Sequence, residues 1–422
     1  MEYLSIIFLY VQSFFFSFLA LPLPALFFNF KRKNNHHHHH HTPNPSTAAT
    51  PDWSQLPAEL LRLISERIDT PLHLLRFRSV CSIWRSSAPP VIPLHHYPFD
   101  FSTLPDHDAF TFSLTKRTVV LITPPPPHHQ TLTPWLVKIG QDLYGRNRLW
   151  HPLYRNPHFA IHEKRVLDLY NLSALPIGNE FDLRQSPPNG SLYMEKVVAV
   201  QGKHGVSVLL TIHISGKLAL FRSGDECWRI IPDMPTPYDD VCVFNGRHFA
   251  VDGTGRTVRV RSDFELEVVA EAVFGGDRKF LVESEGELLL VDKHMSSNCG
   301  GDAEEDEEND DDDDGGGGVY RVGWERAAKF DVFKLDEKEK RWVEVTSLGD
   351  RVLFLGDYCC FSASASDLCV GRGNCVVFKD DALECEIGVF PLDVGRVSPL
   401  SNHPDYSRLF LPREECIGLH CH

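Results

Sequence analysis

Between residues 100 and 412 the sequence is dominated by short runs of β-branched and aromatic residues, and this pattern limits the fold most strongly. Turns such as Ser215-Gly216 and Asn245-Gly246 separate the runs, as antiparallel hairpins require. One unit recurs loosely: two strands around a tight turn, followed by a strand that contains Trp228 or Trp342. Many short strands in degenerate repeats predict an all-β domain, with a β-propeller favoured and a β-sandwich as the alternative.

An acidic segment, residues 296–318, interrupts this β-rich region. Eleven of the thirteen residues from Asp302 to Asp314 are Asp or Glu, and Gly315–Gly318 follow. Such a segment buries no apolar surface and repels itself, so we expect a disordered insert. Calcium is a weak alternative because the spacing of an EF-hand loop is absent. The flanking pattern places strands at residues 118–122, 196–200, 206–214, 217–221, 241–244, 247–251, 257–261, 280–283, 287–292, 330–335, 342–346, 352–355 and 375–378.

Charge and cysteine usage exclude several classes of protein. The formal net charge is −15, and leaving out the eleven carboxylates of the acidic segment gives −15 + 11 = −4. The remainder has no basic stripe that could neutralise phosphates, so nucleic-acid binding is not expected. Eleven cysteines occur without any Cys-x-x-Cys pair, which suits a reducing compartment and indicates a cytoplasmic or nuclear protein.

The N-terminal segment, residues 1–33, points to a membrane instead. Residues 3–21 are mostly apolar and could nearly cross a hydrocarbon core as a helix, and Lys31, Arg32 and Lys33 follow. The basic triplet would then keep the rest of the chain in the cytosol. The alternative is an extension of the gene model that is not part of the working protein. Residues 34–51, with six consecutive His and several Pro, read as a disordered linker.

Residues 52–90 change to helical periodicity. Pro57 falls in the first turn of a predicted helix, and Thr70-Pro71 has the chemistry of a second helix start. Apolar residues recur at helical spacing in the first of these helices: Leu60, Leu61, Ile64 and Ile68. Three short helices in so few residues bury too little surface for high stability, so we expect this unit to pack against something else.

Two short motifs mark the ends of this helical unit. A Leu-Pro-x-Glu-Leu-Leu sequence begins at Leu56, and a Val-Cys-x-x-Trp-Arg sequence begins at Val80. In this order and with helical spacing between them, the segment resembles an F-box. The resemblance implies a small all-α domain whose partner is a Skp-type adaptor, which in turn bridges to a cullin scaffold.

The F-box resemblance also implies which residues contact the adaptor or support that contact. Exposed leucines and a Trp would offer an apolar surface to a partner helix bundle. The alternative for each position is a role in the core of the three helices, which also need apolar residues. The implied positions are Leu56, Pro57, Leu60, Ile64, Leu74, Val80, Cys81 and Trp84.

The β-rich region is similar to the plant F-box family whose C-terminal domain is a degenerate, kelch-like or KIB-like β-propeller. The resemblance covers roughly residues 53–400, and it implies a substrate-binding domain over residues 100–412. The hydrophobic N-terminus and the acidic insert depart from the family pattern. The motifs that carry the resemblance lie at residues 134–139, 167–172, 225–228, 241–252 and 255–258.

Catalytic motifs are not apparent in the sequence, which has no Gly-x-Ser-x-Gly elbow, His-Glu-x-x-His pair or P-loop. Cys416, His420, Cys421 and His422 are soft ligands, but no second ligand pair accompanies them. We therefore expect no catalytic residue, metal or cofactor. The predicted function is the substrate-recognition subunit of a Skp–cullin–F-box ubiquitin ligase, with a protein substrate that the sequence does not identify. The alternative is a ligand-binding or enzymatic propeller with an incidental F-box match.

Overall fold

The structure is a computed structural model, and its description begins at Leu56 and ends at Phe410. Several sequence features lie outside the described residues: the hydrophobic segment 1–33, the linker 34–51, the acidic run 302–314, the motif at 167–172 and the Cys/His-rich C-terminus. The described residues are 56–68, 71–88, 95–99, 110–123, 133–141, 147–154, 173–186, 196–202, 205–225, 228–233, 235–297, 325–356, 358–379 and 387–410.

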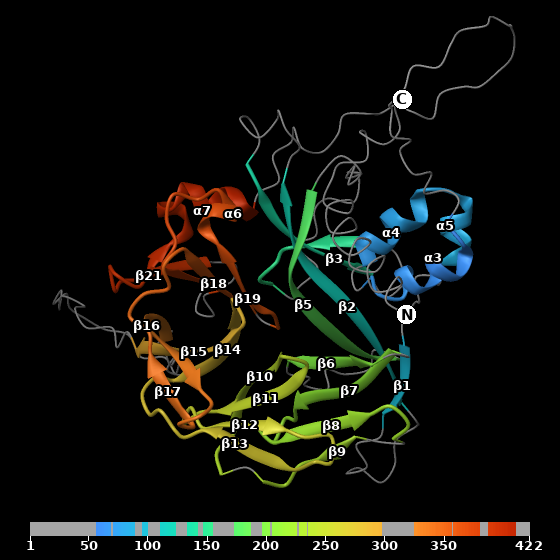
Figure 1. Ribbon diagram of the computed structural model, residues 1–422. Helices are drawn as coiled ribbons and strands as arrows, with labels where there is room; N and C mark the ends of the chain where they lie inside the picture. The colour runs from blue at the N-terminus through green and yellow to red at the C-terminus, as the bar shows by residue number, and fades with distance from the viewer. Residues whose placement is uncertain are drawn as a thin grey trace, which may run out of the picture.

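Three short helices form the first folded unit, as the sequence predicts. They are α3 (Ala58–Ser65), α4 (Pro71–Ser79) and α5 (Ser82–Ser87). Helix α3 begins after Pro57, whose carbonyl accepts the amides of Leu60 and Leu61. Pro71 is the first residue of α4, where its missing amide hydrogen leaves no helical bond unmade. Figure 1 shows the three helices packed together beside the strands.

Twenty-two strands follow in the described part of the chain, and they form four hydrogen-bonded sheets. The first sheet has the order β4-β3-β2-β5-β6-β7-β8-β9, and β1 pairs with β2 outside this path. Its members are β1 (His95–Phe99), β2 (Phe110–Thr123), β3 (Trp135–Gln141), β4 (Asn147–Trp150), β5 (Ser173–Ser186), β6 (Val197–Gly202), β7 (Gly205–Ile212), β8 (Leu218–Arg222) and β9 (Arg229–Ile230).

The other three sheets are smaller, with the orders β10-β11-β12-β13, β14-β15-β16-β17 and β19-β18-β20-β21-β22. Their first eight strands are β10 (Tyr238–Phe244), β11 (Arg247–Asp252), β12 (Thr257–Val260), β13 (Leu266–Ala270), β14 (Arg278–Ser284), β15 (Glu287–Ser297), β16 (Glu325–Asp336) and β17 (Arg341–Glu344). The last sheet contains β18 (Arg351–Leu355), β19 (Cys360–Ser364), β20 (Cys375–Lys379), β21 (Ile387–Pro391) and β22 (Ser398–Pro399), with α6 (Ala365–Leu368) between β19 and β20.

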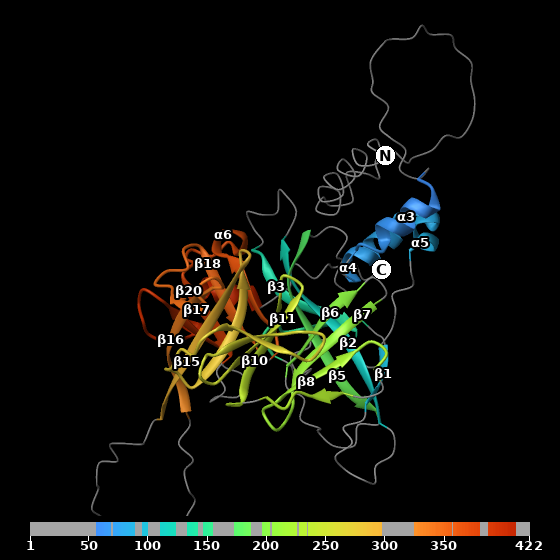
Figure 2. The ribbon, with the colours of Figure 1, turned by 60° about the horizontal axis from the view of Figure 1, so that its bottom comes forward.

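The sheets surround a common centre as the blades of a propeller. The first sheet divides into two blades, because β5 and β6 are joined by the single residue pair Phe181–Val197. Contacts then run from β6 to β10, from β10 to β14, from β14 to β19, and from β19 back to β5. Figure 1 shows these inner strands around the centre, and Figure 2 shows the blades from another side. The predicted β-propeller is confirmed.

The hairpin predicted at Asn245-Gly246 is present between β10 and β11. Both residues have positive φ angles, 49° and 70°, which the tight two-residue turn needs and which Asn and Gly adopt most readily. Every residue of β11 after Arg247 is buried, whereas β10 mixes buried and half-buried positions, so neither strand shows a clean period of two. The sequence nevertheless locates this hairpin to within three residues at each strand end, although it does not predict β13 of the same blade.

Strand β5 is the longest of several strands that the sequence analysis does not name. It is fourteen residues long and contains Pro176 and Gly178, together with the charged residues Glu180 and Asp182. A bulge opposite the Val119/Val120 step of β2 accommodates the proline. Gly178 is closely packed, because a Cβ atom there would lie 3.1 Å from the Cys359 sulfur on the neighbouring blade.

Buried charges hold the first blade together. Arg117 of β2 donates to Glu180 at 2.9 Å and also to Asp182, and both carboxylates belong to β5. Lys138 of β3 donates to Glu180 and, at 3.0 Å, to the carbonyl of Tyr154. All four charged side chains are almost fully buried, and two cations balance two anions. The polar residues of β5 are thus structural, which explains a strand without an apolar pattern.

Asp240, near the start of β10, links three blades. Its two carboxylate oxygens accept from Lys196 Nζ at 2.9 and 3.1 Å, just before β6. One of them also accepts the Leu281 amide of β14 at 2.8 Å. The adjacent Asp239 accepts the Lys279 amide at 2.9 Å. Burial alone would lower the pKa of Lys196, but the Asp240 carboxylate raises it above its ordinary value, so Lys196 carries its positive charge at neutral pH.

The C-terminal helix α7 (Pro404–Phe410) joins the last blade to the first. Its Tyr406 donates a hydrogen bond to the Arg372 carbonyl, beside β20. Tyr406 and Leu409 lie in one apolar cluster with residues of β2, β3, β18 and β20. Phe410 stacks on the His151 ring at a centroid distance of 5.0 Å. Helix α7 therefore closes the ring through side chains.

We predict that Asp240→Ala destabilises the propeller by about 3–5 kcal/mol, because it leaves a buried lysine and the Leu281 amide without their acceptor. Urea unfolding followed by tryptophan fluorescence measures the change. The control is Asp263→Ala, since the Arg261–Asp263 pair is about half exposed and its loss changes stability by less than about 1 kcal/mol. Equal midpoints for the two variants would contradict the linking role of Asp240.

A second prediction concerns acid sensitivity. Burial, together with the charge of Lys138, lowers the pKa of His151 from 6.5 to about 3. The unfolded chain therefore binds a proton that the folded chain excludes, so this contribution is complete above pH 6.5 and falls between pH 6.5 and 3. His151→Gln should flatten the stability profile in that window by up to about 1.4 kcal/mol per pH unit. Melting temperatures at pH 7, 6, 5 and 4 test this, and parallel profiles would refute it.

Candidate functional site

The three-helix unit has a core of its own. Leu61, Phe77 and Trp84 have at most 1% of their surface exposed, and each comes from a different helix. The Phe77 and Trp84 rings are 4.6 Å apart and tilted, a geometry that aromatic pairs favour. A shell of half-buried apolar residues packs around this centre: Leu56, Ile64, Ile68, Leu74, Val80 and Cys81.

Two arginines, Arg78 just before the second sequence motif and Arg85 at its end, fasten α4 to α5. Arg78 donates to the carbonyl of Arg85 at 3.3 Å and to that of Ala88 at 3.2 Å. Arg85 donates in return to the Arg78 carbonyl at 3.2 Å. These bonds satisfy carbonyls at the ends of two short helices, where no intrahelical partner is present. The arginine that ends the motif thus has a structural role in joining the two helices.

Apolar side chains on the outside of this unit are the candidate binding surface. Leu60 and Leu63, three residues apart on α3, have 41% and 47% of their surface exposed, and Ile83 of α5 has 48% exposed. Residues three apart share a helix face, so the two leucines lie side by side. Pro57 is exposed at the start of the same helix. Apolar residues that the unit's own core does not use mark a surface for a partner.

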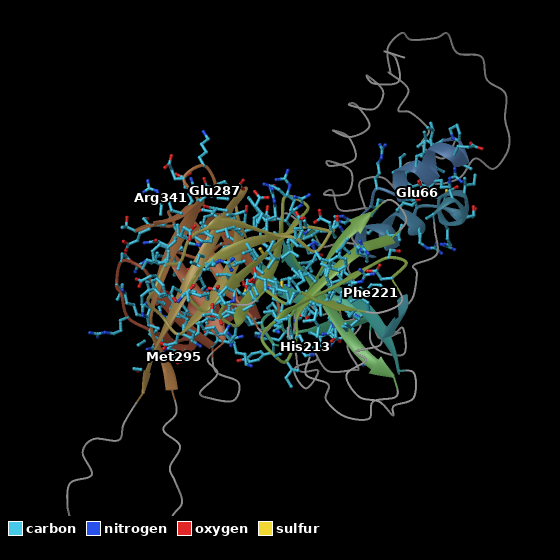
Figure 3. The ribbon with its side chains drawn as sticks, turned by 90° about the horizontal axis from the view of Figure 1, so that it is seen from below. Glu66, His213, Phe221, Glu287, Met295 and Arg341 are labelled. Carbon is cyan, nitrogen blue, oxygen red and sulfur yellow. The ribbon has the colours of Figure 1, made fainter. Side chains whose placement is uncertain are left out.

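The helical unit also contacts the propeller. His73 of α4 forms a hydrogen bond with the backbone at Ala174, near the start of β5. Burial and the neighbouring Arg76 lower the pKa of His73, although the bond to Ala174 opposes this effect. The imidazole is therefore neutral at pH 7. Figure 3 shows Glu66 of this unit at the level of the propeller face that carries Glu287 and Arg341.

Comparison with known proteins identifies both parts of the chain. Residues 105–391 match the family model of the KIB1-4 beta-propeller, a range that ends at the last residue of β21. The chain belongs to this propeller family. F-box protein SKIP23 of Arabidopsis thaliana is 42% identical over 402 residues, which covers 87% of this chain and 96% of that protein. F-box protein At2g17036 of the same plant is 36% identical over 391 residues, covering 86% and 93%.

These relatives confirm the recognition of a plant F-box protein with a KIB-like propeller. Within the F-box, the eight positions named from the sequence fall into three groups. Pro57 and Leu60 are exposed, and Trp84 is buried in the core. The other five are half-buried residues that pack around that core: Leu56, Ile64, Leu74, Val80 and Cys81.

Leu63 and Ile83 are exposed apolar residues that the sequence analysis does not name. Leu63 is three residues after Leu60, and Ile83 directly precedes Trp84. Helical spacing from a named residue is the signal that could have found Leu63. For Ile83 the signal is its position beside an inward-facing tryptophan, since adjacent helical residues face different directions.

Metal-ligating side chains are not brought together in the part of the chain that the structure describes, where no group of three or more His, Cys, Asp or Glu is arranged to hold a metal ion. Burial raises the pKa of Cys359 to about 12 and the pKa of both Cys360 and Cys375 to about 11, so these thiols are protonated at neutral pH. A protonated, buried thiol packs as a small apolar group.

Long apolar helices are also absent from the part of the chain that the structure describes, where no helix is suited to spanning a membrane. The helices that it describes are much shorter than the roughly twenty residues a bilayer needs. The hydrophobic segment of residues 1–33 lies outside that part. The sequence-based hypothesis of an N-terminal anchor therefore stays a prediction.

We predict that Trp84→Ala unfolds the three-helix unit, because removing a fully buried indole costs about 3–5 kcal/mol and so small a unit has little stability in reserve. Hydrogen exchange of the α3 and α5 amides should lose its protection, whereas the propeller amides keep theirs. Leu63→Ala is the matched control, since this exposed leucine contributes little to the core. Unchanged protection in Trp84→Ala would show that the unit does not depend on this residue.

Proposed function

We propose that the chain is the substrate-recognition subunit of a Skp–cullin–F-box ubiquitin ligase. The F-box relatives support this role, and the main structural support is the exposed pair Leu60 and Leu63 beside a complete core. A unit with its own core has no internal use for these leucines. A Skp-type adaptor offers the apolar counterpart, and through it a cullin scaffold completes the complex.

In this proposal the chain contributes position rather than chemistry. The F-box holds the adaptor, the propeller holds a protein substrate, and the contact between His73 and Ala174 helps to fix one module against the other. Holding a substrate near the ubiquitin-charged enzyme raises its effective concentration there, which accelerates transfer without any catalytic residue in this chain. Rigidity of the propeller is therefore part of the function.

The proposal also assigns a compartment. All six described cysteines are free thiols, including the buried Cys359 and Cys375. Free cysteines in this number suit the cytosol or the nucleus, where thiols are kept reduced. Ubiquitin ligases of this class act in the same compartments, so the proposed role and the cysteine chemistry agree.

We predict that Leu60→Asp/Leu63→Asp abolishes adaptor binding. Each charge would face the apolar surface of the partner, and the loss of two central apolar anchors weakens a complex more than a hundredfold. A pull-down of residues 43–422 with a Skp-type adaptor, followed by titration calorimetry, measures the loss. Leu56→Ala/Pro57→Ala tests the start of the motif in the same way.

Val394→Asp is the matched control, because this valine is 57% exposed on the propeller, in the turn between β21 and β22. It introduces a charge at an equally exposed apolar position far along the chain from the F-box. Adaptor binding should not change in this variant. If the parent chain, shown to be folded by its circular dichroism and melting curve, fails to bind the adaptor, the proposed ligase role is wrong.

A further inference from the structure

The last turn of helix α5 carries two serines beside the exposed Ile83. Ser86 and Ser87 follow Ile83 by three and four residues, so they flank it on the same side of the helix. Their hydroxyls donate to the Ile83 carbonyl at 3.0 and 2.8 Å. Ser86 is exposed, whereas Ser87 is half-buried. An accessible hydroxyl therefore lies next to an apolar side chain that is 48% exposed.

Helix α5 lies on the side of the three-helix unit that faces away from the strands, as Figures 1 and 2 show. The hydrogen bond to the propeller at Ala174 comes from His73, which belongs to α4. Arg85, the residue before Ser86, is exposed as well. The described strands therefore leave this end of α5 accessible to an enzyme.

Charge distinguishes α4 and α5 from the rest of the unit. The two helices contain three arginines, Arg76, Arg78 and Arg85, and no Asp or Glu. The carboxylates among the unit's described residues belong to α3 and its C-terminal end, where Glu66 pairs with Arg62 at 3.7 Å. A phosphate group on α5 would thus be the first anion that these two helices carry.

Arg85 already has a structural task at this end of the helix. Its Nε donates to the Arg78 carbonyl at 3.2 Å, which helps to fasten α5 to α4. In the described part of the chain, the Nη groups of Arg85 have no acceptor. A phosphate dianion is a stronger acceptor than a carbonyl, and guanidinium groups bind it with two parallel hydrogen bonds. A phosphate on the neighbouring residue would therefore compete with the Arg78 carbonyl for Arg85.

We propose that Ser86 is a phosphorylation site whose modification releases the adaptor from the F-box. This inference rests on the proposed function and names a regulation of the same surface. A protein kinase transfers the γ-phosphoryl group of ATP to Ser86 Oγ. The bond between Oγ and phosphorus forms, and the bond from that phosphorus to the bridging oxygen of the β-phosphate breaks. ADP leaves, and the hydroxyl proton passes to the solvent.

The phosphate weakens adaptor binding for two reasons. It brings about two negative charges at pH 7 next to Ile83, and an apolar partner surface would have to strip them of water. It also draws Arg85 away from the Arg78 carbonyl, which loosens α5 against α4. The attraction between the phosphate and Arg85 offsets little of this, because ion pairs at exposed sites contribute weakly. The balance therefore favours release.

The first test determines whether Ser86 is phosphorylated. The full chain is incubated with ATP and an extract of plant cells, and tandem mass spectrometry then locates the phosphate. We expect phosphate at Ser86 in the parent and in the matched control Ser87→Ala, and none on α5 in Ser86→Ala. Absence of phosphate from Ser86 in the parent would overturn the inference.

The second test measures adaptor binding by titration calorimetry on the full chain with phosphoserine installed at position 86 through genetic-code expansion. The dissociation constant should rise at least tenfold and return to the parent value after phosphatase treatment. Ser86→Ala should bind as the parent does, because Ser87 keeps its bond to the Ile83 carbonyl. Ser223→Glu, in the exposed turn between β8 and β9, adds a negative charge to the propeller and should not affect binding.

The outcomes separate this inference from the proposed function. Equal affinities of the phosphorylated and unmodified chains would overturn the inference and leave the ligase role standing. A loss of binding that the phosphatase does not reverse would indicate damage to the fold, and it would overturn the inference too. If the unmodified, folded chain does not bind the adaptor at all, the ligase role is wrong and the switch falls with it.

Discussion

The carboxylate of Asp240 is the interaction on which the propeller most depends. Asp240 is on β10. Its carboxylate accepts hydrogen bonds from Lys196, just before β6, and from the Leu281 amide of β14, so it joins three neighbouring blades. Such a buried pair adds little net stability over an apolar core, but it tolerates no alternative arrangement, because each group needs the other. Degenerate repeats could pair their strands in several registers. The Asp240 cluster makes one register of three neighbouring blades the favourable one.

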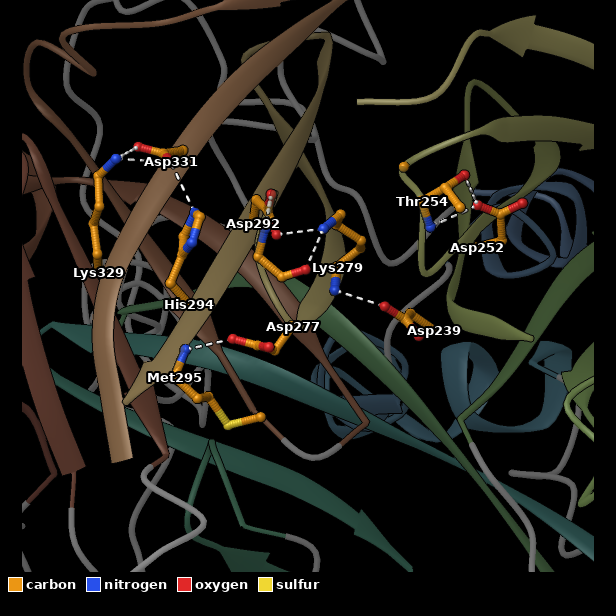
Figure 4. A network of polar contacts seen from close by, with 12 residues as sticks. Asp239, Asp252, Thr254, Asp277, Lys279, Asp292, His294, Met295, Lys329 and Asp331 are labelled. Atoms are coloured by element: carbon orange, nitrogen blue, oxygen red, sulfur yellow. Dashed lines mark hydrogen bonds and ion pairs between the residues drawn. The ribbon is translucent and has the colours of Figure 1, made fainter. Parts of the chain in front are cut away.

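The propeller and the F-box differ in how they distribute their apolar residues between core and surface. The propeller buries its leucines and valines in inter-blade clusters and keeps its inner charges paired, for example Lys279 with Asp292 (Figure 4), so its loops rest on a rigid base. The F-box has only a small core around Trp84 and leaves leucines outside, which is affordable for a unit that works with a partner. A propeller with paired inner charges and an F-box with exposed leucines are the two features that the proposed receptor role requires.

Much of this organisation could be predicted from the sequence, for physical reasons. Asn245-Gly246 revealed its hairpin because few residue pairs adopt two successive positive φ angles. The F-box helices were evident from Pro57 and from apolar spacing. Strand β5 was not, since Glu180 and Asp182 are buried only through long-range partners that no local pattern shows. The exposure of Phe274, in the loop between β13 and β14, could not be predicted from the sequence either, because a lone Phe in a loop usually packs inward.

Closure of the ring through α7 has a consequence for how the protein is made. Strands β2 and β3 leave the ribosome long before Tyr406 and Leu409, the residues that complete their apolar cluster. A nascent chain therefore carries an unfinished blade until translation has ended, and premature termination releases a product with that apolar surface uncovered. Contacts between distant ends also slow folding, because the loop must be closed before they stabilise anything. Until α7 has been synthesised, the chain therefore exposes apolar surface of the kind by which cellular quality control recognises misfolded proteins.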